Sequence, residues 1–223
     1  MTILVADSPA LRCHGGWILC GVILNALIVS APLAVTGLQN RNGLPVLLLL
    51  IGSSVLCAME FNHTLRHSEH LPRRDRYGLA ALMGALLLLF IQWAAIVEFE
   101  TAATVVHRGH PARIIAGCVF ICIGIGVRST AIQQLATGFR SSVQTTRLIT
   151  TGIYARCRHP SETGLLLVML GFTILLCAAW TAMVLLPPAY AVARWRIHLE
   201  ESALRKTFGE QYTAYIARTS RGL

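Results

Sequence analysis

Residues 163–193 read TGLLLVMLGFTILLCAAWTAMVLLPPAYAVA, a run of 31 residues that contains no charged side chain. A membrane-spanning helix needs about 20 apolar residues, so this run is too long for one span and tight for two. The segment 177–181 at its centre offers a place to turn, and the pair Pro187-Pro188 must kink or interrupt the second arm. The run therefore predicts a helical hairpin in a membrane.

Four further apolar windows precede the hairpin, at Trp17–Thr36, Leu44–Phe61, Tyr77–Val97 and the shorter Ile114–Val127. The chain is 55% hydrophobic and only 13% charged, whereas a soluble domain carries about 25% charged residues. We therefore expect an all-α integral membrane protein, a multi-span helical bundle with a C-terminal helical hairpin and a cytoplasmic helix.

The net charge of +9 follows from membrane topology rather than from nucleic-acid binding. The basic residues gather in the polar segments 66–76, 140–158 and 194–221, which lie between or after the predicted spans. The positive-inside rule places these segments and both termini in the cytoplasm. Such a surface also attracts anionic membrane lipid.

No metal site is expected. The seven cysteines are scattered without a Cys-x-x-Cys pair, and Cys118 and Cys122, one helical turn apart, suit packing. His63, His67 and His70 would share one side of a helix, as metal ligands do. Their segment, however, is loop-like and contains a proline and a basic cluster.

Polar groups close to the membrane are concentrated in one part of the chain. Residues 1–112 are N-terminal transmembrane helices with little chemistry, and residues 113–223 hold nearly all of these polar groups. In the second part a helical pattern continues past Arg128, where we expect the fourth helix to leave the membrane. Beyond the hairpin, apolar residues recur at helical spacing until Gly209, which ends or bends that helix.

Arg158, His159 and Pro160 lie directly before the hairpin, and we expect the next helix to begin at Thr163. Ser161 or Thr163 can cap its N-terminus. The exposed amides of a helix N-terminus attract an anionic group such as a carboxylate, and Arg158 offers a forked donor for the same group. The alternative is a membrane-flanking arginine beside a capping loop.

Glu200 and Glu201 are adjacent acids on a predicted helix, so at most one of them can face a given pocket squarely. Arg196 lies one turn before Glu200. The two form either an ion pair on a solvated helix or part of a site for a cationic ligand. Gly124-Ile125-Gly126 indicates close helix packing more than ligand binding.

Three segments follow one another in a recognisable order around the hairpin: GIGVRSTAIQQLATG (124–138), RLITTGIYARCRHPSETG (147–164) and RIHLEESALRKTFGEQYTAYIAR (196–218). Together they resemble the isoprenylcysteine carboxyl methyltransferase family and its phospholipid methyltransferase relatives. The resemblance covers the C-terminal part of the chain and implies S-adenosylmethionine as the cofactor, bound without a Rossmann domain.

The resemblance also implies roles for individual residues. Its cofactor-binding positions are Arg147, Leu148, Ile149, Tyr154, His159, Pro160, Ser161 and Glu200. It implies Arg158 and Arg196 as catalytic residues that orient the acceptor, with no catalytic base, and it places Arg196 and Arg218 with the substrate. Many relatives have tyrosine where this chain has Glu162. A carboxylate there either disfavours an anionic acceptor, in favour of an amine, or is a first-turn acid without contacts.

The sequence therefore predicts a membrane methyltransferase whose lipophilic or small acceptor offers a carboxylate, an amine or a thiol. The alternatives are an NADPH-dependent membrane reductase of the sterol-reductase type and a non-enzymatic membrane scaffold. The arginine-rich composition, with Lys206 as the one lysine, is compatible with a bacterial inner membrane, with the active site facing the cytoplasm.

Overall fold

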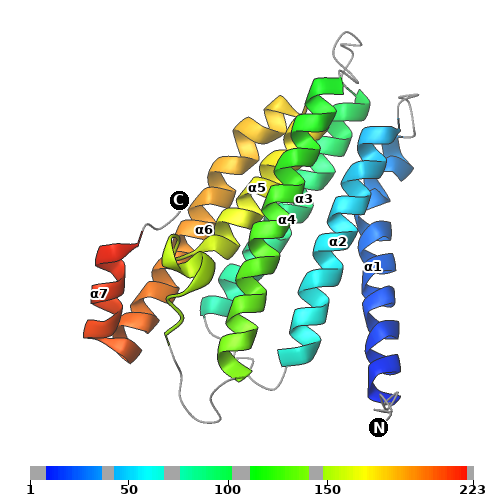
Figure 1. Ribbon diagram of the computed structural model, residues 1–223. Coiled ribbons are helices and arrows are strands. Elements are labelled where there is room, and N and C mark those ends of the chain that lie inside the picture. The colour runs from blue at the N-terminus through cyan, green and yellow to red at the C-terminus, as the bar shows by residue number, and fades with distance from the viewer. Residues whose placement is uncertain (1–8, 37–42, 68–75, 102–110, 141–147, 220–223) are drawn as a thin grey trace.

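The computed structural model describes residues 9–36, 43–67, 76–101, 111–140 and 148–219. Every regular element within these ranges is helical (Figure 1). The elements are α1 (Pro9–Thr36), α2 (Leu44–His67), α3 (Arg76–Thr101), α4 (Pro111–Arg140), the short 3-10 helix η3 (Gly152–Ala155), α5 (Pro160–Leu175), α6 (Ala179–Phe208) and α7 (Glu210–Arg218).

Helices α1 to α4 each contain a stretch that is long and apolar enough to cross a membrane: 16–36, 44–62, 79–101 and 111–135. Helix α5 is apolar but has only 16 residues, about 24 Å at 1.5 Å per residue, which is less than the thickness of a bilayer core. The predicted all-α, multi-span bundle is confirmed, and the hairpin arm is short, as its length indicated.

The tightest packing in the bundle is between α4 and α5, where glycines let the two backbones approach closely. A Cβ added at Gly124 would lie 2.6 Å from the carbonyl oxygen of Gly164, and one added at Gly117 would lie 2.8 Å from the backbone nitrogen of Leu175. A Cβ at Gly126 would meet nothing within 4 Å. The packing interpretation of Gly124 is therefore confirmed, whereas Gly126 faces open space.

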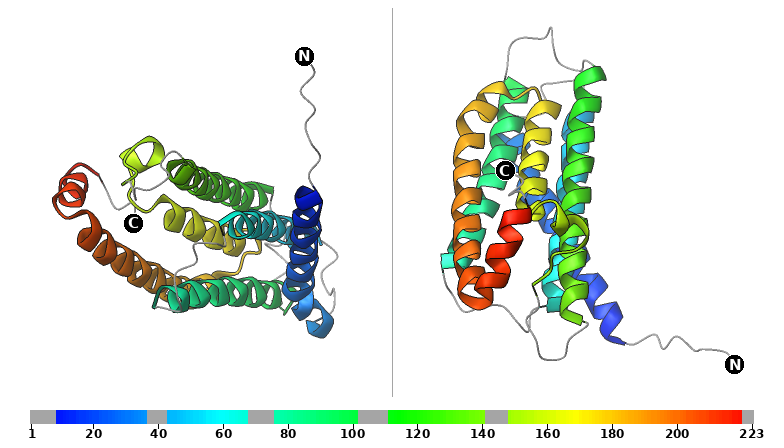
Figure 2. Two further views of the ribbon diagram at one scale, coloured as in Figure 1. Left: turned by 90° about the horizontal axis from the view of Figure 1, so that it is seen from below. Right: turned by 60° about the vertical axis from the view of Figure 1, so that its left-hand side comes forward.

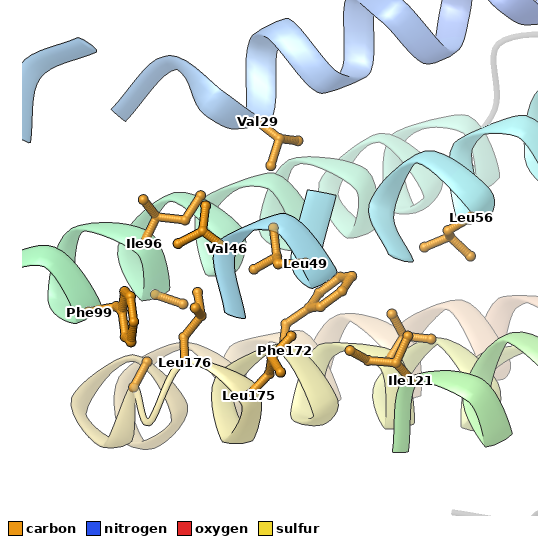
Figure 3. Close-up of a cluster of buried hydrophobic side chains, with 13 residues drawn as sticks. Val29, Val46, Leu49, Leu56, Ile96, Phe99, Ile121, Phe172, Leu175 and Leu176 are labelled. Atoms are coloured by element: carbon orange, nitrogen blue, oxygen red, sulfur yellow. The ribbon is translucent and has the colours of Figure 1, made fainter. Parts of the chain in front are cut away.

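A single apolar cluster joins the N-terminal helices to the hairpin (Figure 3). Phe172 of α5 is fully buried, and it lies among Leu49 of α2, Ile121 of α4 and Ile96 of α3. The end-on view shows α5 between α4 on one side and α3 with α6 on the other, with α1 at the edge (Figure 2). Elements before and after residue 112 therefore share one core.

The hairpin turns at Leu176–Ala178, where Cys177 adopts a positive φ of 55°. The carboxylate of Glu98 in α3 fixes the start of α6 by accepting hydrogen bonds from the backbone amides of Trp180 (3.0 Å) and Thr181 (2.8 Å). The predicted turn is confirmed.

Helix α6 is not interrupted at Pro187-Pro188 but continues for 30 residues to Phe208. Two prolines remove only two amide donors, and α3 and α5 pack alongside α6, so the helix survives. The predicted hairpin arm and the predicted cytoplasmic helix are thus one element. Gly209, with a φ of 51°, ends it and begins α7.

At one end of the molecule, helix α5 begins further into the bundle than its two long neighbours end. Helices α4 and α6, with 30 residues each, extend beyond the residue at which α5 begins (Figure 1). The segment 148–159, which contains η3, and helix α7 lie at this end (Figure 2). Most of the polar residues singled out from the sequence face one another there.

Candidate functional site

His159 lies between the two acids of α6. Its Nδ1 is 3.3 Å from Oε2 of Glu200, and its Nε2 is 3.4 Å from Oε1 of Glu201. Each ring nitrogen of His159 therefore faces one of the two carboxylates. Two segments that are 41 positions apart in the sequence are thereby brought into contact.

The two acids differ in their surroundings. The side chain of Glu201 is 4% exposed and lies 3.2 Å from Nη1 of Arg158 and 3.8 Å from Nη2 of Arg205. The side chain of Glu200 is 44% exposed. Glu201 therefore holds the cluster together, whereas Glu200 has a free side toward solvent. No role was expected for Glu201, although two adjacent acids on a helix cannot both face one pocket squarely.

Helix α7 closes this end of the site. The hydroxyl of Tyr215 donates to the carbonyl oxygen of Tyr154 in η3 at 2.6 Å, and the Tyr154 hydroxyl donates to the carbonyl of Ala131 in α4 at 3.4 Å. Burial raises the pKa of Tyr154, raises that of Tyr212, and raises that of Tyr215 to about 12. All three hydroxyls therefore stay protonated at neutral pH, and the Tyr154 side chain is buried.

The first turn of α5 differs from the prediction. The helix begins at Pro160, not Thr163, with His159 as the N-cap residue and no capping side chain. Proline at the first helical position needs no amide partner, which favours the earlier start. The hydroxyl of Thr163 donates to the carbonyl of His159 at 3.1 Å, and Ser161 accepts from an arginine. The predicted cap by Ser161 or Thr163 is wrong, so the first-turn amides have no side-chain partner within the described chain.

That arginine is Arg128 of α4, which lies buried within the helix bundle. Arg128 is only 7% exposed, and its Nε pairs with the carboxylate of Glu60 in α2. Its Nη1 donates to the Oγ (2.8 Å) and the carbonyl oxygen (3.0 Å) of Ser161. The carboxylate of Glu60, whose side chain is 40% exposed, compensates the buried charge of Arg128, and α4 continues beyond it to Arg140.

Glu162 pairs with Arg196 of α6 at 3.1 Å. Of the two alternatives for Arg196 and Glu200, the ion pair is not formed, because Arg196 pairs with an acid of another helix. The interpretation of Glu162 as an acid without contacts is wrong. We name the four residues Glu60, Arg128, Glu162 and Arg196 the charged ring. It contains two acids and two bases, so its formal charge is balanced.

The charged ring forms one end of a cavity of about 460 Å³ between the helices. Apolar side chains of α2, α3, α5 and α6 make up most of its wall, and three polar residues line it further along: Asn25, Ser53 and Gln92. We name His159, Arg158, Glu200 and Glu201 the His159 cluster. The first turn of α5 lies between this cluster and the cavity, since His159 contacts the acids of the cluster and Glu162 lines the cavity.

The remaining predicted site residues have no described ion pair with the acids of α6 and do not line the cavity. Pro160 is buried in the first turn of α5, and Leu148 and Ile149 are half-buried in the segment before η3. Arg218 is exposed near the end of α7 and does not line the cavity, and its substrate role stays a prediction. Arg147 lies outside the described residues.

No group of three or more His, Cys, Asp or Glu side chains that could hold a metal is found in the described part of the chain. The side chains of His63, His67 and His70 fall outside that part, so the structure does not test this triplet. The six described cysteines, which include Cys118 and Cys122, are free thiols.

Comparison with known proteins connects this arrangement to one family. Residues 112–211 match the model of the phospholipid methyltransferase family. The protein-S-isoprenylcysteine O-methyltransferase B of Arabidopsis thaliana is 33% identical over 117 residues, which are 48% of this chain and 57% of the relative. The protein-S-isoprenylcysteine O-methyltransferase of Tribolium castaneum is 36% identical over 116 residues, which are 48% of this chain and 39% of the relative.

Two comparisons extend over the whole chain. The human protein-S-isoprenylcysteine O-methyltransferase is 25% identical over 232 aligned residues, covering 99% of this chain and 68% of the relative. The solved structure of the eukaryotic intramembrane Ras methyltransferase, isoprenylcysteine carboxyl methyltransferase, superposes with a TM-score of 0.52 at 18% identity, covering 100% of this chain and 86% of that one.

The chain therefore has the all-α integral membrane fold of this structure. The predicted resemblance is confirmed: residues 112–211 match the model of the phospholipid methyltransferase family, and about half of the chain is similar to isoprenylcysteine methyltransferases. The chain covers less than two thirds of the length of the plant and insect relatives. The matches favour neither the reductase nor the scaffold alternative.

Proposed function

We propose that this protein is an integral membrane methyltransferase that transfers a methyl group from S-adenosylmethionine to a lipophilic or small acceptor. The observation that carries the proposal is the contact between His159 and Glu200 at 3.3 Å, beside a cavity on the other side of the same helical turn. Two binding sites that share one turn of α5 suit a transfer between two molecules, because reacting groups must be held close and in line.

The residues around His159 have the chemistry that the cofactor requires. The half-exposed carboxylate of Glu200 can accept hydrogen bonds from an ammonium group, and His159 holds that carboxylate in place. The uncapped amides at the start of α5, together with the helix dipole, suit a carboxylate. When bound, S-adenosylmethionine supplies the electrophilic methyl group on a sulfonium that becomes a neutral thioether, while an amine acceptor releases one proton.

The family resemblance adds further cofactor residues to this proposal. They are Arg147, Leu148, Ile149, Tyr154, Pro160 and Ser161. Arg158 acts by positioning, since it holds Glu201 at 3.2 Å beneath the cofactor site. The closure of α7 over η3 limits access of water to this end of the bundle, which strengthens electrostatic interactions there.

The cavity is the proposed site of the acceptor, with the charged ring at the reacting end. The relatives are named for S-isoprenylcysteine, and the apolar walls suit a lipophilic chain of that kind or of a lipid. Arg196 can orient an anionic acceptor only if it releases Glu162. We propose that Glu162 instead favours an amine or another neutral or cationic acceptor.

Residues 1–112 and 113–223 contribute different parts of this enzyme. The second part holds the cofactor residues, and the first supplies Glu60, Ser53 and Gln92 to the cavity wall. We further propose that the protein lies in a bacterial inner membrane with the His159 cluster facing the cytoplasm. The arginine-rich segments at that end support this orientation. Accessibility labelling of a cysteine placed at Glu210, from either side of the membrane, tests it.

The function is tested by incubating membranes that contain or lack the protein with S-adenosylmethionine bearing a labelled methyl group. We expect labelled lipophilic product only in the first sample, and mass spectrometry of that product identifies the acceptor and the methylated atom. Absence of labelled product from membranes, from prenylated cysteine and from lipid amines would contradict the proposal.

A further inference from the structure

Three polar side chains from three different helices meet inside the bundle, away from the charged ring. Nδ2 of Asn25 in α1 and Nε2 of Gln92 in α3 each donate a hydrogen bond of 3.0 Å to the same oxygen, Oγ of Ser53 in α2. Ser53 is 3% exposed and Gln92 is 2% exposed. We name these three residues the polar node.

The polar node is incompletely satisfied. A serine hydroxyl accepts two hydrogen bonds and donates one, so Ser53 still has its proton to donate. Among the described hydrogen bonds, none uses that proton or the amide oxygens of Asn25 and Gln92. All three residues line the cavity, and their unused polar atoms are not among the fully buried ones that lack a partner, so they are accessible to a molecule in that space. A molecule in the cavity can therefore accept the proton of Ser53 and donate to the amide oxygens of Asn25 and Gln92.

Packing between helices is the simplest role for polar residues in a membrane bundle. That role alone would be served by hydrogen bonds that satisfy the groups mutually. Here both amides instead use one oxygen, and both amide oxygens are left over. The arrangement resembles a binding subsite more than a completed helix contact.

Helix α2 contributes a residue to both the polar node and the charged ring, so the spacing between the two can be read along it. Ser53 precedes Glu60 by seven residues. Seven helical residues correspond to about 10 Å. The lining between the two levels is mainly apolar: Leu56, Leu88, Leu89, Leu165 and Leu166.

We infer that the cavity selects an amphiphile that carries a hydroxyl group within its apolar body, about 10 Å from its methyl-accepting end. A hydroxyl group is the smallest group that both donates and accepts hydrogen bonds, so it can pair with the proton of Ser53 and with an amide oxygen of the polar node. This inference rests on the proposed function, because it concerns the acceptor of the same reaction. The polar node is then a specificity determinant, since it lies too far from the charged ring to contact the reacting atoms.

The test compares amphiphiles that share one amine head and one chain length. One has a saturated chain, one has a hydroxyl about 10 Å from the head, and one has the hydroxyl next to the head. For the wild type we expect the KM of the second to be roughly three- to tenfold below that of the other two, the effect of one hydrogen bond. Ser53→Ala and Gln92→Leu should each bring this ratio close to one.

Ser30→Ala is the matched control, because the hydroxyl of Ser30 in α1 bonds to its own helix at Leu27 and does not line the cavity. It should retain the wild-type ratio. The inference is overturned if the wild type shows no preference among the three amphiphiles, or if the preference survives in both Ser53→Ala and Gln92→Leu.

A binding measurement separates this inference from the proposed function. The same amphiphiles are tested for the rise in unfolding temperature that they give the detergent-solubilised protein, which requires no methyl transfer. A hydroxyl-dependent rise that Ser53→Ala abolishes supports the polar node even if no product forms, in which case only the proposed function fails. Equal rises for all three amphiphiles, with product formed, overturn the inference and leave the function intact.

Discussion

The carboxylate of Glu162 and the guanidinium of Arg196 lie 3.1 Å apart, between the first turn of α5 and the middle of α6, at the charged end of the cavity. The side chain of Glu162 is 7% exposed, and that of Arg196 is 32% exposed. The pair therefore neutralises the arginine that the family resemblance assigns to the acceptor. This contact sets the charge that the cavity presents to an incoming molecule.

Removing the charge of Glu162 should change the acceptor preference. In Glu162→Gln, Arg196 is freed and the repulsion of an anionic acceptor disappears, so we expect the ratio of kcat/KM for a carboxylate acceptor over an amine acceptor to rise roughly tenfold or more. Glu210→Gln, an exposed acid of α7, is the control. An unchanged ratio would show that Glu162 does not face the acceptor.

Filling the cavity should impair long acceptors. Gly84 of α3 lines the cavity, and a Cβ added there meets nothing within 4 Å. Gly84→Leu should therefore fold and occupy acceptor space, raising the KM of a long-chain acceptor by about tenfold, the order of one buried leucine-sized group. Gly126→Leu, equally unobstructed but outside the cavity lining, should leave that KM unchanged. Equal KM values in both variants would place the acceptor elsewhere.

The α4–α5 contact predicts a second pair of glycine variants. Gly124→Ala drives a Cβ to within 2.6 Å of a backbone oxygen, so the helices must separate, at a cost of about 1–3 kcal/mol of unfolding free energy. Gly126→Ala adds a methyl group to open space and should be neutral or slightly stabilising. Thermal unfolding in detergent measures both. A Gly124→Ala protein as stable as Gly126→Ala would be inconsistent with this packing.

The docking of α7 should weaken in the alkaline range. Burial raises the pKa of Tyr215 to about 12, above the value of about 10 for free tyrosine. The folded state therefore binds the proton more tightly, and its contribution to stability is complete below pH 10 and is lost as the pH rises to 12. Tyr215→Phe removes the hydrogen bond to Tyr154, about 1 kcal/mol, and should flatten this decline in pH-dependent unfolding. A Tyr215→Phe curve as steep as the wild-type curve would count against it.

Much of the fold could be predicted because hydrophobic length is a local property of the sequence. The first three spans, the hairpin turn near Cys177 and the end of α6 at Gly209 lie where the pattern placed them, whereas the fourth span, 111–135, is longer than the predicted window 114–127. The start of α5 at Pro160 was not predicted, because a proline can either precede a helix or occupy its first position. The continuity of α6 through Pro187-Pro188 was not predicted either, because the effect of a proline inside a helix depends on the helices packed around it. The convergence of His159 with Glu200 followed only from the order of the family motifs.

The charged ring and the polar node could not be derived from spacing. Arg128 finds its partner Glu60 68 positions away, and Ser53 finds Asn25 and Gln92 on two other helices. Such pairs depend on how the helices are arranged, which the sequence pattern does not encode. The available signal was the presence of charged and amide side chains within or beside apolar spans, where each one requires a partner.

Binding of S-adenosylmethionine to the detergent-solubilised protein tests most directly whether His159 and Glu200 form one site. We expect calorimetry to detect binding by the wild type and by Glu210→Gln. In Glu200→Gln the dissociation constant should rise about tenfold to hundredfold, since a charge-assisted hydrogen bond is lost. Equal affinity in Glu200→Gln and Glu210→Gln would contradict the account.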